Sequence, residues 1–259
     1  MPIKMIVTDL DGTLLRSDKS ISDYTKRVLE RCRARGILIA FATARSEISS
    51  VRFSREFMPD IFISQGGALA RRGSETLWQV VIPPDIASAL IRRCMEDTGV
   101  LQFGLETGDK YLSTTLFDPS DFGYEHAEEI DFTQLADYND VCKVSIKASG
   151  RQVAQAIADD FPALNFISFR DEDWHTFRAA GATKENALAA VADALEIGAD
   201  EIAAFGDDMS DIDMLIYAGN GVAMGNAIDE VKAAADFICN SNDEDGVARW
   251  LEERVESLL

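Results

Sequence analysis

Short, continuous apolar runs separated by helix-length segments recur at both ends of this 259-residue chain. A run such as residues 37–42, which has no polar residue at alternate positions, is typical of a strand buried on both faces. Strands are expected over 3–8, 37–42, 61–64, 202–205, 221–224 and 237–238. Helices are expected between and after them, over 22–35, from about 45 to 57, and over 184–195, 209–218, 227–235 and 245–257. This alternation predicts an α/β fold with a parallel sheet and right-handed crossovers.

The pattern changes near Pro83-Pro84 and returns to its first rhythm near Lys184. The intervening segment predicts an α+β unit with helices over 85–98 and 150–161. Its strands are expected over 100–106, 110–116, 141–147, 164–169 and 174–178, with a loop and a short helix over 118–140. Residues 141–147 alternate in polarity, which predicts a half-exposed strand. We therefore expect a discontinuous core domain, 1–82 and 182–259, interrupted by a second domain over 83–181.

Charge and composition exclude several classes of function. The net charge of −20 argues against a nucleic-acid or acidic-membrane surface, because both kinds of partner need basic patches. No signal-peptide pattern and no apolar run of membrane-spanning length is present, so we expect a cytoplasmic protein. The four cysteines lack any CxxC spacing and are expected to be reduced thiols. Two isolated histidines do not suit a His-rich metal site or a Ser-His-Asp mechanism.

Two carboxylates, Asp9 and Asp11, follow the first apolar run at positions i and i+2. If the chain stays extended through them, both side chains point the same way. Like charges brought close together need a cation between them or a proton on one of them. An Asp-rich turn after a strand is the alternative interpretation of this pair alone.

Polar residues also follow the other buried strands. In an open parallel sheet, the residues after the carboxyl ends of the strands meet at one edge, where binding sites form. The acidic and polar residues expected there are Asp9, Asp11, Thr43, Arg45, Asp207, Asp208 and Asp211. Lys184 begins the helix that leads to the strand at 202–205. A hard divalent cation with oxygen ligands, Mg²⁺ above all, would neutralise this cluster, and Mg²⁺ beside a lysine suits phosphoryl transfer.

Four motifs occur in a characteristic order. They are DLDGTL at 9–14, the strand end at Thr43, Lys184, and GDDMSDIDML at 206–215. Together they resemble the haloacid dehalogenase-like (HAD) phosphohydrolase superfamily. The position of the insertion between Thr43 and Lys184, and the tail over 221–251, are similar to the Cof-type subgroup with a C2B cap (HAD-IIB). This resemblance implies a Rossmann-like core domain with an inserted α+β cap.

The resemblance also implies a role for each matching residue. Asp9 would be the nucleophile that forms an aspartyl-phosphate, and Asp11 the general acid and then the general base. The implied Mg²⁺ ligands are Asp9, the backbone carbonyl of Asp11, and Asp207. Asp211 would complete the set, directly or through water, or would orient Lys184. The implied substrate-binding residues are Leu10, Thr43, Ala44, Lys184 and Ser210.

Several of these residues have a simpler structural interpretation. Thr43 can cap the helix that follows it, and Arg45 can form a helix-start salt bridge as readily as a phosphate contact. Asp208 is expected to be a helix-start acid only. Lys143 and Arg178 could reach a substrate, but solvated strand faces are the expected position for both.

The chain departs from the subgroup at three points. Ser210 replaces the usual Asn, which leaves its phosphate contact in doubt because the side chain is shorter. Strand two ends in Thr-Ala-Arg rather than Thr-Gly-Arg, with Ala44 at the changed position. Gln65-Gly66-Gly67 stands in place of the usual Asn-Gly-Ala. None of these changes removes the nucleophile, the acid/base or the metal ligands.

We therefore expect a Mg²⁺-dependent phosphatase that hydrolyses a small phosphate monoester, such as a sugar phosphate. The cap would close over the leaving group and set specificity. A sugar phosphomutase, or a non-catalytic protein that binds a phosphorylated metabolite, are the alternatives. The expected partner is the small-molecule substrate, without nucleic acid or membrane, in a monomer or a small homo-oligomer.

Overall fold

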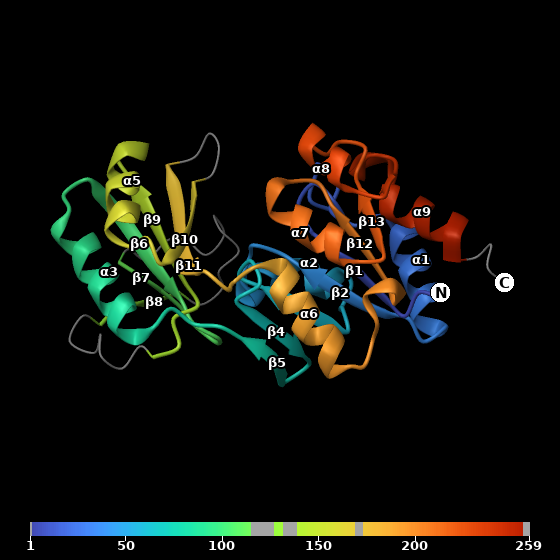
Figure 1. Cartoon of the computed structure of the whole chain (residues 1–259), viewed down its shortest axis with the longest axis horizontal. Coiled ribbons are helices and arrows are strands. Elements are labelled where there is room, and N and C mark those ends of the chain that lie inside the picture. The colour runs from blue at the N-terminus through green and yellow to red at the C-terminus, as the bar shows by residue number, and fades with distance from the viewer. Residues whose placement is uncertain (1, 115–126, 132–138, 169–172, 256–259) are drawn as a thin grey trace. The chain divides into compact units, whose positions relative to one another are not determined.

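The computed structural model describes residues 2–114, 127–131, 139–168 and 173–255 (Figure 1). It contains two compact units, each with its own sheet and hydrophobic core. The first unit comprises 1–45, 51–78 and 183–259, and the second comprises 46–50 and 79–182. Most of the loop and short helix expected over 118–140 lies outside the described residues, but residues 127–129 within it form a strand that was not predicted.

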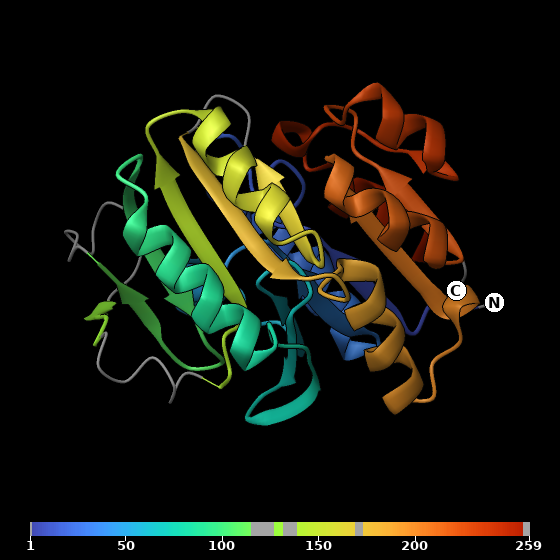
Figure 2. The same ribbon diagram turned by 60° about the vertical axis from the view of Figure 1, so that its left-hand side comes forward.

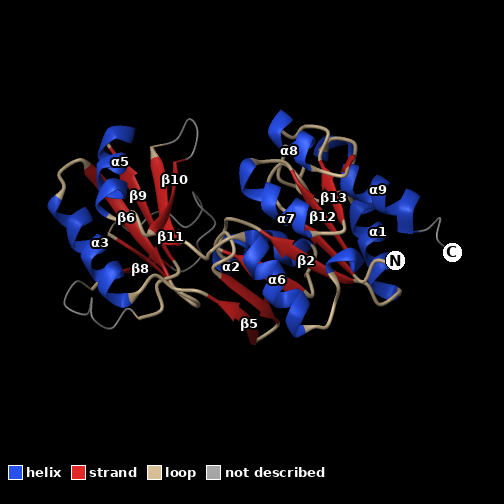
Figure 3. Ribbon diagram, in the orientation of Figure 1, coloured by secondary structure: helices blue, strands red, loops and turns tan. Residues whose placement is uncertain are grey.

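The sheet of the first unit has eight strands in the order β14-β13-β12-β1-β2-β3-β4-β5. Strands are drawn in red in Figure 3, where β2, β5, β12 and β13 of this sheet are labelled. Six of them are parallel: β1 (Met5–Thr8), β2 (Leu38–Ala42), β3 (Ile61–Ser64), β12 (Ile202–Gly206), β13 (Asn220–Ala223) and β14 (Phe237–Ile238). The predicted α/β class with a parallel, Rossmann-like sheet is confirmed. Two further strands, β4 (Leu69–Arg72) and β5 (Glu75–Gln79), extend the sheet beyond β3 and were not predicted.

The helices of this unit are α1 (Asp23–Ala34), α2 (Glu47–Glu56), α6 (Lys184–Ala194), α7 (Ile212–Tyr217) and α8 (Asp229–Ala234), which lie between strands along the chain, and α9 (Gly246–Val255), which follows the last strand. α1 begins where predicted, because the Ser22 hydroxyl accepts the backbone N–H of Thr25 and satisfies a donor of the first turn. Its apolar side buries Val28, Leu29 and Cys32 in the core. Short 3₁₀ turns precede β12 (Ala199–Glu201), α7 (Met209–Asp211) and α9 (Asn242–Glu244).

The second unit has a six-stranded sheet in the order β10-β11-β9-β6-β7-β8. Its strands are β6 (Val100–Glu106), β7 (Tyr111–Ser113), β8 (Ala127–Glu129), β9 (Lys143–Ala148), β10 (Leu164–Ser168) and β11 (Trp174–Ala179). α3 (Pro84–Glu96) and α5 (Arg151–Asp160) lie against the same face of this sheet (Figure 2). That face carries the apolar residues of β6, β9 and β11, so the unit has a two-layer α+β architecture.

The polar side of β9 differs from the prediction. A half-exposed strand was expected there, with Lys143 and Arg178 on solvated faces. Both side chains are buried, and Lys143 Nζ lies 2.6 Å from a carboxylate oxygen of Glu106, which is itself only 1% exposed. Arg178 and Glu106 each lie directly opposite Lys143 on the neighbouring strands. The alternating polarity of this strand therefore belongs to a buried face whose charges are paired. The sequence suggested a solvated face because polarity alone does not distinguish a paired, buried charge from a solvated one.

Candidate active site

Asp9 and Asp11 follow the end of β1 and have different partners. The strand ends at Thr8, and the chain then turns: the backbone N–H of Leu15 bonds to the carbonyl of Leu10 at 2.8 Å, and Gly12 has φ +79°. The premise that the chain stays extended through both residues is therefore wrong. Asp9 points to Lys184, whereas Asp11 points to Arg45.

Lys184 connects two of the predicted acidic residues. Its Nζ donates to Oδ1 of Asp9 and to Oδ1 of Asp211, each at 2.6 Å, and all three side chains are buried. The position is set by α6, which begins at Lys184 after the Thr183 side chain accepts the N–H of Asn186. A lysine at a helix start is disfavoured by the helix dipole, so its burial here depends on the two carboxylates.

Three carboxylates form a compact oxygen cluster at the ends of β1 and β12. Oxygen atoms of Asp9, Asp207 and Asp211 all lie within 4.8 Å of one another. The Thr13 hydroxyl donates to Asp207 Oδ1 at 2.6 Å, and Asp211 Oδ2 accepts the backbone N–H groups of Asp207 and Asp208. These contacts hold the acids in place although their charges repel.

The titration of this cluster reflects its burial and its repulsion. Burial raises the pKa of Asp9 to about 8, with the charges of Asp211 and Asp207 adding to it and Lys184 opposing it. Burial likewise raises the pKa of Asp207 to about 6, with Asp211 adding to it and Thr13 opposing it. Burial alone would lower the pKa of Lys184, but the negative charges of Asp211 and Asp9 have the larger effect, so the pKa is raised overall. A cluster of oxygen donors that is short of positive charge fits a hard divalent cation.

Asp11 lies outside this cluster and has two cationic partners. Arg45 donates to both of its carboxylate oxygens, and Lys19 Nζ lies 2.7 Å from Oδ1. Partial burial alone would raise the pKa of Asp11, but the hydrogen bonds and charges of Arg45 and Lys19 have the larger combined effect and hold the pKa below the usual 3.8. Arg45 therefore forms a salt bridge, which is one of the two roles that the sequence left open for it, and its partner is Asp11.

The remaining predicted substrate-binding residues differ in the exposure of their side chains to solvent. The Thr43 hydroxyl is buried and accepts the N–H of Arg45 at 3.1 Å, so it caps the turn after β2. Ala44 and Ser210 are exposed, Ser210 within the 3₁₀ turn before α7. The Leu10 side chain is fully buried in the core, so only its backbone could serve a substrate.

Some contacts around the site were not predicted. The Asn226 side chain donates to the Gly12 carbonyl at 2.7 Å and accepts the N–H of Asn242, which joins the loop after β1 to the segment after β14. Thr13 belongs to the DLDGTL motif, so the motif could have indicated its contact with Asp207. Lys19 carries no spacing signal that connects it to Asp11. Asp208 accepts the N–H of Met209 and caps the 3₁₀ turn, as a helix-start acid does.

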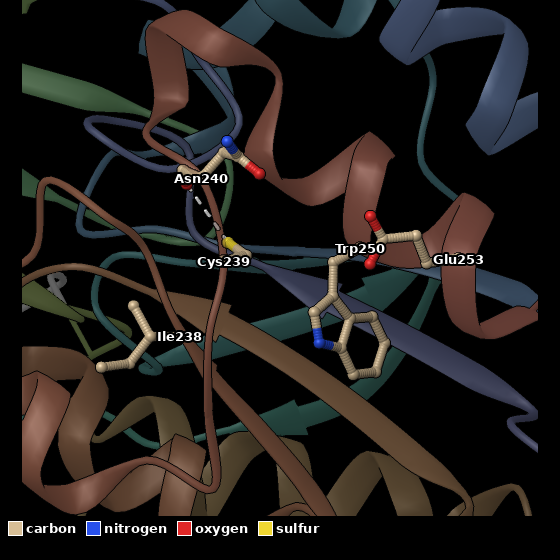
Figure 4. A pocket seen from close by; sticks show the side chains of 5 residues that line it. All are labelled: Ile238, Cys239, Asn240, Trp250 and Glu253. Atoms are coloured by element: carbon tan, nitrogen blue, oxygen red, sulfur yellow. Dashed lines mark hydrogen bonds between the residues drawn. The ribbon is translucent and has the colours of Figure 1, made fainter.

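A separate pocket of about 310 Å³ lies beside β14 and α9 (Figure 4). Its lining residues are Ile238, Cys239, Asn240, Trp250 and Glu253. The indole N–H of Trp250 has no hydrogen-bond partner within the described ranges, and the ring packs against Phe205 and Phe237. This pocket shares no lining residue with the carboxylate cluster.

Among the described residues, every helix is too short or too polar to traverse a bilayer.

Comparison with known proteins identifies the family. The family model of haloacid dehalogenase-like hydrolases matches residues 6–251. A 5-amino-6-(5-phospho-D-ribitylamino)uracil phosphatase of Bacillus subtilis, YitU, is 27% identical, and the match covers 96% of each chain. An HMP-PP phosphatase of Klebsiella pneumoniae is 28% identical over 89% of this chain and 87% of its own.

Solved structures agree with this assignment. A haloacid dehalogenase-like hydrolase from Bacteroides thetaiotaomicron superposes with a TM-score of 0.84 at 29% identity, covering 99% of this chain and 100% of that one. A subclass IIB sugar phosphatase of the superfamily has the same fold, with a TM-score of 0.81 at 24% identity and coverage of 96% and 98%. The chain belongs to the haloacid dehalogenase-like hydrolase family, as the sequence predicted, and like the curated relatives described above it is a phosphatase.

Proposed function

We propose that this chain is a Mg²⁺-dependent phosphatase that hydrolyses small phosphate monoesters by transferring the phosphoryl group to Asp9. One observation carries the proposal: buried Lys184 holds Asp9 against Asp211, within an oxygen cluster that also contains Asp207. A buried carboxylate fixed by an ammonium group is oriented for attack, and its charge is offset when a phosphate dianion approaches.

The reaction has two displacements at phosphorus. First, Asp11 takes up a proton from solvent as the phosphate dianion approaches, because a nearby negative charge raises the pKa of a carboxyl group. A carboxylate oxygen of Asp9 then bonds to phosphorus, the ester P–O bond breaks, and Asp11 gives its proton to the leaving alkoxide. An aspartyl-phosphate and a free alcohol result. Water then attacks the same phosphorus, Asp11 takes a proton from that water, and the bond from phosphorus to Asp9 breaks. Inorganic phosphate is released and the Asp9 carboxylate is restored.

Other residues of the site would bind the transferring group. The proposed donors to its oxygens are the Thr43 hydroxyl and the backbone N–H groups of Leu10 and Ala44, with Ser210 as a weaker contact. Lys184 would offset the charge shared by Asp9 and the phosphoryl group.

Asp9, Asp207, Asp211 and the backbone carbonyl of Asp11 are the proposed Mg²⁺ ligands. The all-oxygen donor set and its excess of negative charge suit this ion. Bound there, the cation would supply positive charge against the phosphoryl oxygens and the nucleophile.

The substrate class is a small phosphate ester. The two relatives described above are named for different compounds, a phosphorylated ribitylaminouracil and HMP-PP. Neither name identifies the leaving group for this chain. A panel of phosphate monoesters, including sugar phosphates, would identify the leaving group that it prefers.

The test is Asp9→Asn assayed with an aryl phosphate in Mg²⁺ and in EDTA. The substitution removes the nucleophilic charge at nearly constant volume, so we expect turnover to fall to background, and the wild type to lose turnover in EDTA. Asp18→Asn is the matched control, because Asp18 is exposed on the same loop and bonds only to Ser20 among the contacts described. Turnover that survives in Asp9→Asn would refute the proposed mechanism.

A further inference from the structure

The turn between β13 and α8 carries Asn226, whose side chain contacts the loop after β1. Its Nδ2 donates to the Gly12 carbonyl at 2.7 Å, and its Oδ1 accepts the backbone N–H of Asn242 at 2.9 Å. A backbone N–H can only donate and a carbonyl can only accept, so the two partners fix which end of the amide faces Gly12. Among the residues that the structure describes, no second donor reaches the Gly12 carbonyl.

Two backbone hydrogen bonds hold this turn against the end of β12. The N–H of Met224 donates to the carbonyl of Gly206 at 3.0 Å, and the N–H of Ile228 donates to the carbonyl of Asp207 at 3.2 Å. Neither bond involves the loop after β1. Asn226 therefore reaches that loop from a position that β12 fixes.

Gly12 needs an external restraint because its own backbone has little. It has φ +79°, and a Cβ there would lie 2.3 Å from Oδ2 of Asp207, so the loop backbone passes directly against this carboxylate. Glycine permits this approach, but it is also the residue whose dihedral angles are least restricted. The peptide on one side of Gly12 carries the Asp11 carbonyl, and the peptide on the other side carries the Gly12 carbonyl. Holding the second carbonyl therefore limits the rotation of the first.

We propose that Asn226 is a positioning residue for the metal site, which acts through the Gly12 peptide by restraining the backbone carbonyl of Asp11. This inference rests on the proposed function, in which that carbonyl is a ligand of Mg²⁺. The amide of Asn226 is occupied by its two hydrogen bonds, so Asn226 is not itself a ligand. Groups that orient metal ligands typically contribute about 10- to 100-fold to metal affinity.

The alternative is that Asn226 only fastens the loop to the rest of the unit. The same loop has a second attachment, because Arg16 donates to both carboxylate oxygens of Asp245, at 3.1 and 2.6 Å. Among the described contacts, this fork includes none of the proposed metal ligands. If fastening were the whole role of Asn226, the loss of either attachment would affect the metal site in the same way.

The experiment measures the dissociation constants of Mg²⁺ and Ca²⁺ by calorimetric titration of the metal-free protein. Mg²⁺ demands near-ideal octahedral geometry, whereas Ca²⁺ tolerates variable geometry and ligand number, so a displaced oxygen should affect Mg²⁺ more. In Asn226→Ala we expect the Mg²⁺ constant to rise roughly 10-fold and the Ca²⁺ constant to rise less than about 3-fold. The ratio of the two constants is the readout that a purely structural role would not change.

Two control variants remove comparable contacts elsewhere. Asn220→Ala is the matched control, because the Asn220 amide also donates to a backbone carbonyl, that of Ile202 at the opposite end of β12. Arg16→Met removes the second attachment of the loop. Both variants should lower the melting temperature and leave the Mg²⁺/Ca²⁺ ratio of the wild type unchanged.

Two results would overturn the inference. One is an unchanged ratio of the two constants in Asn226→Ala, and the other is an equal change of that ratio in Arg16→Met. If Asn226→Ala does not fold, Asn226→Asp gives the same readout, since it keeps the acceptor for Asn242 and removes the donor to Gly12. Its added negative charge would by itself attract both divalent cations alike, so a selective loss of Mg²⁺ affinity would come from the missing donor.

Failure of the proposed function would appear in different measurements. Turnover that survives in Asp9→Asn would refute the mechanism without changing the ratio of the two dissociation constants. A wild type that binds no Mg²⁺ would overturn both the inference and the proposed cofactor.

Discussion

Replacing Lys184 by Met should destabilise the metal-free protein strongly and the metal-bound protein weakly. Lys184 is 4% exposed, and its two ion pairs at 2.6 Å offset the buried charges of Asp9 and Asp211. Removing one partner of a buried ion pair typically costs about 3–5 kcal/mol, because a charge is left buried without compensation. That cost corresponds to a fall in melting temperature of roughly 6–20 °C for a protein of this size.

A divalent cation should recover most of this loss. With Lys184 absent, the carboxylates of Asp9, Asp207 and Asp211 have only the metal to offset them, so Mg²⁺ should raise the melting temperature of Lys184→Met more than that of the wild type. Thermal unfolding of both proteins in EDTA and in millimolar Mg²⁺ measures the difference.

The Lys143–Glu106 pair of the second unit provides the matched control. It has the same 2.6 Å separation and similar burial, but it lies outside the carboxylate cluster. Lys143→Met should be destabilised equally in EDTA and in Mg²⁺. A loss in Lys184→Met that is equally insensitive to Mg²⁺, or smaller than about 1 kcal/mol in EDTA, would refute the reasoning.

Two further predictions concern the same cluster. In EDTA the folded protein holds protons on Asp9 and Asp207, with pKa values raised to about 8 and about 6, that the unfolded chain releases near pH 4. The free energy of unfolding should therefore fall as the pH rises from about 4 to about 8, by about 1.4 kcal/mol per pH unit for each proton fully taken up on folding. Bound Mg²⁺ should flatten this pH dependence. Denaturant midpoints measured across that pH range test the prediction, and a flat profile in EDTA would contradict it. Gly12 has φ +79°, and Gly12→Ala places a Cβ 2.3 Å from Asp207 Oδ2, so this variant should bind Mg²⁺ more weakly in a calorimetric titration. Gly36 is the control, because it has a similar φ of +81° but no atom within 4 Å of an added Cβ. Gly36→Ala should lower the stability of the fold without changing the affinity for Mg²⁺.

The parallel sheet was predictable because its strands are unusually uniform. Residues of β1, β2 and β3 are buried almost throughout, so each appears in the sequence as an unbroken apolar run. β4 and β5 were missed because they form the end of the sheet: β5 is largely exposed, so neither an apolar run nor a clear alternation marks it. The buried polar face of β9 was missed because pairing between Lys143 and Glu106 depends on the strand order, which the sequence does not reveal.

The candidate site was predictable as a set of residues but not as a geometry. Motif order identified Asp9, Lys184, Asp207 and Asp211, and the structure brings these four together. The spacing of Asp9 and Asp11 suggested an extended chain through both residues, but the chain turns after Thr8, and each carboxylate has partners of its own. The cations that hold Asp11 come from a turn and from the end of β2, and neither position is marked by a repeat or a fixed spacing.

The most direct test of the account is to trap the phosphorylated enzyme during turnover. Borohydride reduces an aspartyl-phosphate to homoserine, so peptide mass mapping after quenching identifies the residue that carried phosphate. We predict homoserine at position 9, formed only when both substrate and Mg²⁺ are present and absent from Asp9→Asn. Phosphate on another residue, or full turnover without modification at position 9, would contradict it.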